Sequence, residues 1–432
     1  MRIALVSLHT SPLALAGSGD AGGMNTFLLG VADALVARGH EVELLTRATD
    51  ARHGTAVEVR TPVGALVRFL EAGPRASVPK SELAALAPAF ADALRALPRF
   101  DVVHSNYWLS GLAALPVADE WGAPHVLSLH TVAALKNARL APGDAPEPAS
   151  RLDGERMLVR ASALTVTHTA AERDAVLDLL GAAPTRVVTV PPGVDVELFH
   201  PGAKAPGRPV LLVLARIQPL KGIDLAIEML ARMPSTSRPR LVIAGGVSPG
   251  HDDYAAGLRR RTHELGLDDD VTFLPAQARD EAAGLLREAS LVLVPSYSET
   301  FGLVALEAAA SGTPVIAART TGLVDAVADG VSGVLLDGRE PEAWAAAVGG
   351  LLADPVGLAE LSTSAVGFAA RHSWGRTAEL IESQYLGAVA ADIARAAFGD
   401  SPVFFHAHPD DESISTGGAV AAIVRSGARA TM

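Results

Sequence analysis

Ser298-Glu-Thr-Phe-Gly-Leu-Val-Ala-Leu-Glu307 is the stretch around which the rest of the chain is organised. It follows an apolar run, residues 291–295, that is typical of a strand buried in a parallel sheet. It leads into an alanine-rich run that ends at Ser311–Gly312, which predicts a helix with a glycine stop. The next apolar run, residues 313–317, predicts another strand. The stretch is therefore a loop-to-helix corner between two strands.

Such a corner favours a phosphate, because a helix start presents unpaired backbone N–H groups and a partial positive charge. We expect Phe301, Gly302 and Leu303 to supply these amides. Glu307 would lie on the helix flank, where its carboxylate can accept two hydrogen bonds from a ribose diol. Glu299 would reach the group on the other side of the phosphates. The alternative is two solvated acids, which are common near helix starts.

Composition narrows the classes of protein to consider. The chain has 432 residues, of which 49% are apolar, so two or three domains with large cores are expected. Its net charge of -12 argues against a nucleic-acid partner, because phosphate backbones bind basic surfaces. Cysteine is absent, which excludes disulfides and thiol catalysis. The N-terminal apolar run is too short for a signal peptide or a membrane span, so we expect a soluble, cytoplasmic protein.

Strand and helix patterns alternate along most of the chain. The opening strand 2–7, Gly-rich loop 17–25, helix 26–38 and strand 41–46 predict a parallel, doubly wound sheet. A second α/β unit begins at about residue 209. We therefore predict an N-terminal domain at 1–195 and a C-terminal domain at 196–373, with a final helix, about 374–397, that packs back on the first. A ligand cleft would separate the carboxyl ends of the two sheets. The sequence is also compatible with a homodimer.

The Gly-rich loop is the first element expected across the cleft from Gly302. Gly22 and Gly23 open the first helix, where their amides can meet an anion. Asp20 and Asn25 flank the loop with polar groups that a sugar can use. The G-x-G-x-x-G spacing of a dinucleotide fingerprint is absent, and a Gly-rich loop alone is often only a turn.

Two cations follow the first strand of the second unit. Arg216 ends the strand, and Lys221 precedes the next helix. A diphosphate carries two negative charges, which an Arg fork and a Lys point charge at a strand end would neutralise. The alternative is an ordinary basic surface loop. The position at a carboxyl-terminal strand end favours the diphosphate.

Polar residues also gather at strand ends of the first unit. His9, Tyr107, His130 and Thr131 fall at or just after predicted strands, although a lone buried histidine is usually structural. Two further cations, Lys80 and Arg151, lie in loop or helix-start positions from which they can fold over the same pocket; they would suit a phosphorylated acceptor.

The α/β pattern restarts near residue 400 and breaks off, which predicts a short fragment of a further α/β domain at 400–432. His408, Asp410 and Asp411 are a potential metal cluster, because His and Asp are zinc ligands and the second Asp is a potential base for a metal-bound water. No histidine follows His408, so a third ligand of that type is missing and we expect the site to be incomplete and non-functional.

The corner with Glu299 and Glu307 resembles the E-x7-E motif of retaining GT-B glycosyltransferases, which have two Rossmann-like domains facing across a cleft. More narrowly, the chain resembles the D-inositol-3-phosphate glycosyltransferases of mycothiol biosynthesis. The segments that carry this second resemblance are 1–25, 104–111, 130–137 and 311–317. That family moves N-acetylglucosamine from UDP-GlcNAc to an inositol phosphate and releases UDP.

The resemblance implies a role for each candidate residue. Its catalytic residues would be His130, Glu299, Arg216 and Lys221. The donor would bind Gly23, Arg216, Lys221, Glu299, Phe301, Gly302, Leu303 and Glu307. The acceptor would bind His9, Asp20, Gly22, Asn25, Lys80, Tyr107, Thr131 and Arg151, with Lys80 and Arg151 on its phosphate. No metal would be essential for transfer, although Mg²⁺ can assist.

Three single residues and one three-residue segment depart from the family pattern. Asn106 stands in place of His, Gln277 in place of a donor-side Arg, Leu152 in place of one Arg of a pair, and Thr320–Thr321–Gly322 in place of a Gly-Gly turn. A related transferase with another sugar nucleotide or acceptor is therefore an alternative. The run Phe405-His-Ala-His-Pro-Asp-Asp-Glu412 resembles the start of zinc-dependent N-acetylglucosaminyl deacetylases, and this resemblance implies His408 and Asp411 as zinc ligands and Asp410 as the base. A bifunctional enzyme with that hydrolase activity is the alternative from another class, disfavoured because the segment is incomplete; Zn²⁺ would be needed only there.

Overall fold

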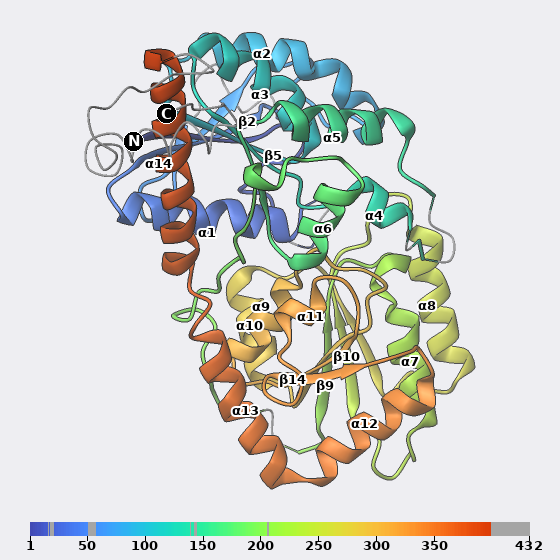
Figure 1. The fold of residues 1–432 in the computed structure, drawn as a ribbon. Coiled ribbons are helices and arrows are strands. Elements are labelled where there is room, and N and C mark those ends of the chain that lie inside the picture. Colours follow the sequence, from blue (N-terminus) through green and yellow to red (C-terminus); the bar gives the residue numbers. More distant parts are fainter. Residues whose placement is uncertain are drawn as a thin grey trace.

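The computed structural model describes residues 1–398, apart from 16, 18–20, 51–57, 139, 142–144 and 205–206; beyond residue 393 only the backbone is described. The chain forms two lobes, each a sheet with helices on both faces (Figure 1). The prediction of two doubly wound Rossmann-like units is thereby confirmed. The predicted fragment at 400–432 lies outside the described residues.

The first lobe has an eight-stranded sheet in the order β3-β4-β2-β1-β5-β6-β7-β8, parallel except for β3. Its strands are β1 (Arg2–Ser7), β2 (Glu41–Arg47), β3 (Glu58–Arg60), β4 (Leu66–Leu70), β5 (Val102–Asn106), β6 (His125–Ser128), β7 (Leu164–Thr167) and β8 (Val187–Thr189). The strand order reverses direction between β1 and β5. A doubly wound sheet binds its ligand at such a switch point, at the carboxyl ends of the strands.

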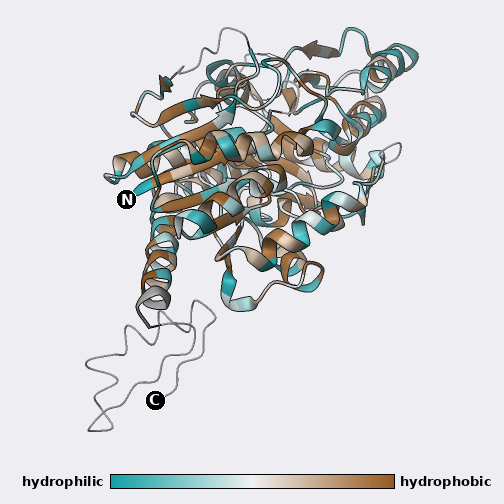
Figure 2. Cartoon of the chain, turned by 90° about the horizontal axis from the view of Figure 1, so that it is seen from above, coloured by the Kyte–Doolittle hydropathy of each residue, from teal (hydrophilic) through white to brown (hydrophobic). Residues whose placement is uncertain are grey.

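Helices cover both faces of this sheet, and apolar clusters fill the space between. They are α1 (Gly23–Ala37), η1 (Lys80–Leu86), α2 (Ala87–Arg95), α3 (Trp108–Trp121), α4 (Ala133–Asn137), α5 (Ala149–Ala161), α6 (Ala170–Asp178) and η2 (Pro184–Arg186). Figure 2 shows that the strands are predominantly hydrophobic, as expected for a sheet covered on both sides.

The second lobe has a six-stranded parallel sheet in the order β11-β10-β9-β12-β13-β14, with its own switch point between β9 and β12. Its strands are β9 (Val210–Leu214), β10 (Arg240–Ala244), β11 (Val271–Leu274), β12 (Leu291–Val294), β13 (Val315–Ala318) and β14 (Gly333–Leu336). Its helices are η3 (Pro219–Lys221), α7 (Ile223–Arg232), α8 (Asp252–Glu264), α9 (Arg279–Glu288), α10 (Leu303–Ala310), α11 (Leu323–Ala326), α12 (Pro341–Ala353) and α13 (Pro355–Ala369).

The last described helix, α14 (Trp374–Phe398), returns to the first lobe and packs against α1 (Figure 1). Its Ile381 and Tyr385 are fully buried in the first lobe's core, and the Tyr385 hydroxyl hydrogen-bonds His104 of β5 at 2.6 Å. A Cβ on Gly30 of α1 would lie 2.3 Å from the Trp374 ring, so a glycine is required where the helices cross.

Within the described residues, no single helix is both long and apolar enough to span a membrane. Helices α12 and α13 reach that length and composition only as a pair, and they are bent by 97° at the break between them.

Candidate active site

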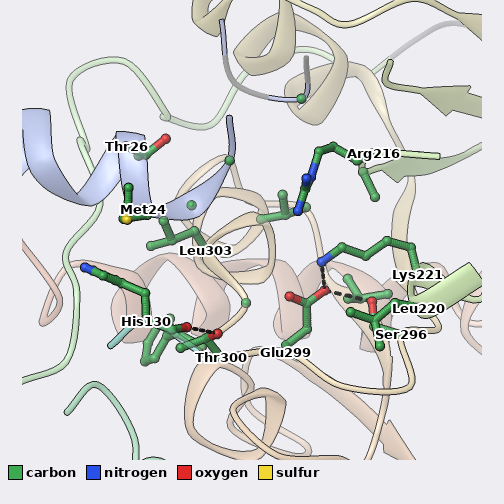
Figure 3. A pocket seen from close by; sticks show the side chains of 18 of the residues that line it. Met24, Thr26, His130, Arg216, Leu220, Lys221, Ser296, Glu299, Thr300 and Leu303 are labelled. Carbon is green, nitrogen blue, oxygen red and sulfur yellow. Dashed lines mark hydrogen bonds and ion pairs between the residues drawn. The ribbon is translucent and has the colours of Figure 1, made fainter. Parts of the chain in front are cut away.

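A pocket of about 380 Å³ lies between the lobes, at the carboxyl ends of both sheets. Residues from β1, β5, β6 and β9 to β12, or from the loops that follow them, contribute to its walls. Figure 3 shows His130 and the start of α1 on one side, and Arg216, Lys221 and Glu299 on the other. Both switch points therefore open into the same space.

The corner that follows β12 forms as predicted, with α10 beginning at Leu303 after Gly302. Gly302 has φ 101°, and a Cβ there would lie 2.7 Å from Leu323 Cδ2, so no other residue fits without strain. Phe301, Gly302 and Leu303 all line the pocket. The corner brings backbone N–H groups to a helix start that faces the other lobe.

Glu307 lies one turn into α10 and is buried. Burial raises the pKa of its carboxyl to about 7, and the nearby Arg279 guanidinium opposes that rise. Arg279 Nη1 donates to Glu307 Oε1 at 3.5 Å and to Thr26 Oγ1 of the other lobe at 3.3 Å. The carboxyl group therefore sits in a dry part of the pocket, where hydroxyl groups of a ligand are its natural partners.

Glu299 is held by two donors on one carboxylate oxygen (Figure 3). Lys221 Nζ donates to Glu299 Oε1 at 2.6 Å, and Ser296 Oγ donates to the same oxygen at 2.7 Å. Arg216 and Lys221 point into the same part of the pocket. This part can bind an anion through the two cations, while Glu299 orients Lys221.

The start of α1 faces this corner across the pocket. A Cβ on Gly23 would lie 3.5 Å from Leu303 Cδ1, so the starts of α1 and α10 nearly touch. Gly22 and Gly23 line the pocket, but Asn25 does not. Asn25 is buried and braces the loop, accepting from the Gly22 N–H at 3.0 Å and donating to Thr10 and Ser11. Asp20 lies outside the described residues.

Cations surround Tyr107 at the other end of the pocket. Lys80 Nζ lies 5.0 Å and Arg151 Cζ 4.7 Å from the centre of the Tyr107 ring. The His9 ring lies 4.3 Å from the same ring, and its pKa is lowered by burial and by the two cations. Burial raises the pKa of Tyr107 to about 12, so its hydroxyl stays protonated. Lys80, Tyr107 and His9 line the pocket.

Arg151 supports this end from behind and is not among the lining residues. Its guanidinium binds Glu155 at 2.7 Å and Glu147 at 3.0 Å, and it donates to both the carbonyl and the hydroxyl of Thr131 at 2.8 Å. Thr131 itself lines the pocket. In this structure Arg151 therefore fixes Thr131 and adds positive charge behind Tyr107.

His130 joins the two lobes. Its backbone adopts φ 59°, and its carbonyl accepts a hydrogen bond from Thr300 Oγ1 of the second lobe (Figure 3). The ring is bound to Asn106 Oδ1 at 2.8 Å, and burial holds its pKa well below the usual value. Asn106, in whose place the resemblance predicted a His, thus holds the His130 ring.

Several pocket residues were not predicted from the sequence. Arg279 starts α9 at the carboxyl-terminal edge of β11, a position that could have pointed to it. Thr300 lines the pocket beside Glu299, and His168 and Glu172 line it beside His130. Thr321 and Gln277, which the sequence already marked as departures from the family pattern, also line the pocket, and the Gln277 amide is turned to the Pro275 carbonyl at 2.7 Å.

Within the described part of the chain, no three His, Cys, Asp or Glu residues are arranged to hold a metal ion. The predicted zinc ligands His408 and Asp411, and the base Asp410, lie outside that part.

Comparison with known proteins agrees with this geometry. Residues 22–193 match the glycosyl transferase 4-like domain, and residues 196–371 match the glycosyl transferases group 1. A sucrose-phosphate synthase structure from Thermosynechococcus elongatus has a TM-score of 0.82 at 29% identity, covering 90% of this chain and 99% of that one. Anabaena HepE, solved in complex with UDP and glucose, shares the fold, with a TM-score of 0.72 at 20% identity over 89% of this chain and 99% of its own.

Relatives of similar length are more similar in sequence. The D-inositol 3-phosphate glycosyltransferase of Acidothermus cellulolyticus is 43% identical, over 90% of this chain and 91% of the relative. That of Nocardia farcinica is 44% identical, over 90% of both chains. The chain therefore belongs to the glycosyl transferases group 1 and, within them, to the D-inositol 3-phosphate glycosyltransferases.

Proposed function

We propose that this enzyme transfers N-acetylglucosamine from UDP-GlcNAc to an inositol phosphate, with retention of configuration and release of UDP. The observation that carries the proposal is the 43–44% identity to D-inositol 3-phosphate glycosyltransferases over 90% of the chain. The pocket supports it, because one end holds Arg216 and Lys221 and the other holds Lys80 backed by Arg151. Two anionic groups at opposite ends suit a diphosphate donor and a phosphorylated acceptor.

The donor's diphosphate would lie between Arg216, Lys221 and the facing starts of α1 and α10. Backbone N–H groups at Gly23, Gly302 and Leu303 would add hydrogen bonds there. Glu307 would accept from the ribose hydroxyls. Glu299 would contact the transferred sugar, with Lys221 shared between it and the diphosphate.

The acceptor would lie at the other end of the pocket. Its phosphate would bind Lys80, with Arg151 contributing charge through the Tyr107 and Thr131 wall. His9, Tyr107 and Thr131 would bind ring hydroxyls or the phosphate. Asn25 would act by fixing the loop around Gly22.

In the reaction, the bond between the sugar's anomeric carbon and the diphosphate oxygen breaks while a bond to the acceptor oxygen forms on the same face. The acceptor's proton passes to a leaving phosphate oxygen. The two glutamates are therefore not a glycosidase acid–base pair. Arg216, Lys221 and the helix-start amides stabilise the charge on the leaving UDP, and closed lobes exclude water. We expect no essential metal, with Mg²⁺ as an assisting ion.

The decisive experiment measures UDP release and disaccharide formation from UDP-GlcNAc with inositol 3-phosphate and with inositol. We expect transfer to the phosphate, and a rise of about tenfold or more in its KM for Lys80→Ala, because one charge-assisted contact is lost. Inositol is the matched control, since it lacks the group that Lys80 would bind. Equal use of both acceptors by the wild type would refute the acceptor assignment. Thermal shifts with UDP-GlcNAc, UDP-glucose and GDP-mannose would expose a different donor.

A further inference from the structure

Beside His130 the pocket has a side wall made by His168 and Glu172, to which the proposed reaction assigns no role. Both residues come from the corner between β7 and α6, where Thr169 caps the helix. Each is only 3% exposed, and both line the pocket. Buried polar groups in a ligand pocket need partners, so this wall requires explanation.

Two of the four polar side-chain atoms of these residues are hydrogen-bonded within the protein. His168 Nδ1 is bound to the Val190 carbonyl at 3.1 Å, and Glu172 Oε2 accepts the His168 backbone N–H at 2.7 Å. Two atoms are left: His168 Nε2 and Glu172 Oε1 are buried and have no hydrogen-bond partner. The wall therefore contains one ring nitrogen and one carboxyl oxygen whose hydrogen-bonding capacity is unused within the protein.

The chemistry of these two atoms selects the kind of group they bind. The Val190 carbonyl can only accept, so Nδ1 carries the proton and Nε2 presents a lone pair. Burial keeps the ring neutral, with a pKa lowered to about 4. Burial raises the pKa of Glu172 to about 7, so near neutral pH its free oxygen can either accept or donate. A hydroxyl group, which also donates and accepts, matches this pair, whereas a phosphate would meet a lone pair and a carboxyl.

The position of the wall points to the transferred sugar. The His168 ring lies 4.8 Å from the His130 ring, and the His130 carbonyl is bound to Thr300, the neighbour of Glu299. With the diphosphate at Lys221 and the sugar at Glu299, as proposed above, the sugar would extend toward His130. The second lobe closes the same corner, because the Asp325 carboxylate accepts the backbone N–H of Ala170 at the start of α6.

We propose that His168 and Glu172 form a subsite for one hydroxyl group of the transferred hexose, and so select the donor by the hydroxyl pattern of its sugar. This inference rests on the proposed function, because it takes the donor to be a UDP-hexose.

The test compares UDP-GlcNAc, UDP-glucose and the single-deoxy analogues of UDP-GlcNAc, in both binding and turnover. We expect the wild type to disfavour one deoxy analogue by about 10–100-fold, the effect of one hydrogen bond lost in a buried site. His168→Asn keeps a donor near the Val190 carbonyl but removes Nε2. This variant should bind UDP-GlcNAc more weakly than the wild type does, by a similar factor. It should bind that analogue no worse than it binds UDP-GlcNAc. The Kd for UDP should not change, and His168→Gln, which places an amide near Nε2, should restore part of the discrimination.

His125→Asn is the matched control. His125 is a buried histidine of the same sheet, outside the pocket lining, with its ring bound to Ser105 and Ser162. Its loss should lower stability without changing discrimination among donors. The inference is overturned if the wild type binds every deoxy analogue as well as the parent, if His168→Asn keeps full discrimination, or if no UDP-hexose binds. Intact discrimination without transfer to inositol phosphate would refute the proposed reaction and leave the subsite supported.

Discussion

Thr321→Val is the substitution that most directly tests how the donor end of the pocket is built. Thr321 Oγ1 accepts the Glu299 N–H at 2.9 Å and donates to the Glu299 carbonyl at 2.7 Å. The side chain is 6% exposed, and its backbone has φ 25°, which is rare for a β-branched residue. A strained threonine that grips both backbone groups of Glu299 indicates a position set by the site.

The size of the effect follows from what valine leaves behind. Valine has the same shape, so the backbone strain is common to both proteins. The Glu299 N–H loses the partner identified for it, which costs about 1–3 kcal/mol for a buried group. The Glu299 carbonyl still accepts from the Gly322 N–H at 3.0 Å, so its loss is smaller. We expect the free energy of unfolding to fall by about 2 kcal/mol.

The substitution should affect transfer of the sugar more than binding of the nucleotide. Glu299 binds Lys221 at 2.6 Å, so a loosened backbone would misplace the carboxylate that we propose contacts the sugar. We expect kcat/KM for UDP-GlcNAc to fall about tenfold or more, because small misplacements are costly in transfer reactions, while the Kd for UDP changes little. Urea unfolding and initial-rate kinetics measure the two effects.

Two controls frame this result. Thr321→Ser keeps the hydroxyl and should behave nearly as the wild type. Thr363→Val removes an exposed hydroxyl that donates only within α13, to the Ala359 carbonyl, and should be neutral. The reasoning fails if valine matches the wild type in both assays, or if serine loses as much as valine.

Two further outcomes are expected. Gly302→Ala should lower the free energy of unfolding by about 1–3 kcal/mol and weaken UDP binding, because Gly302 has a φ of 101° and lies close to Leu323. Gly284→Ala, in open space on α9, should instead raise the free energy of unfolding by up to about 1 kcal/mol. Equal effects of the two substitutions would contradict this reasoning. Stability in urea should fall between pH 7 and pH 5, because five buried histidines have lowered pKa values and the unfolded chain then binds more protons. The pKa values of Glu172 and Glu307 are raised to about 7, so protonation of these two carboxyls stabilises the folded chain as the pH drops and opposes the fall. We expect the five histidines to outweigh the two carboxyls. A rise in stability toward pH 5 would show that the carboxyls dominate. The histidines are His9, His104, His125, His130 and His168.

The end of the pocket that we propose binds the donor was largely predictable from the sequence. Carboxyl ends of parallel strands converge at one edge, so Arg216 after β9 and Glu299 after β12 had to be neighbours once both strands were recognised. The same argument placed His9 and Tyr107 together beside β1 and β5. The order of the strands along the chain, which the hydrophobic periodicity reveals, was sufficient to predict where these residues lie.

Side-chain direction was less predictable, because it depends on contacts that periodicity does not encode. Asn25 was expected to face a sugar, yet its amide is used to hold residues 10, 11 and 22. Arg279 begins a charged run, Arg279-Asp-Glu281, that is typical of a solvated helix start, yet it bridges the lobes. Glu172 looks like an ordinary N3 capping residue, and only the pocket around it shows that one oxygen is left over.

Several residues both line the pocket and form hydrogen bonds between the two lobes. Thr300 donates to the His130 carbonyl, Arg279 to Thr26, and the Gly246 N–H to the Gly17 carbonyl at 3.0 Å. Each is a polar contact worth about 0.5–1.5 kcal/mol net, so a few of them hold the lobes together only weakly. A ligand that touches both lobes adds free energy comparable to theirs. Because most of these residues line the pocket, we expect a bound ligand to favour the closed arrangement of the lobes and product release to require these hydrogen bonds to break.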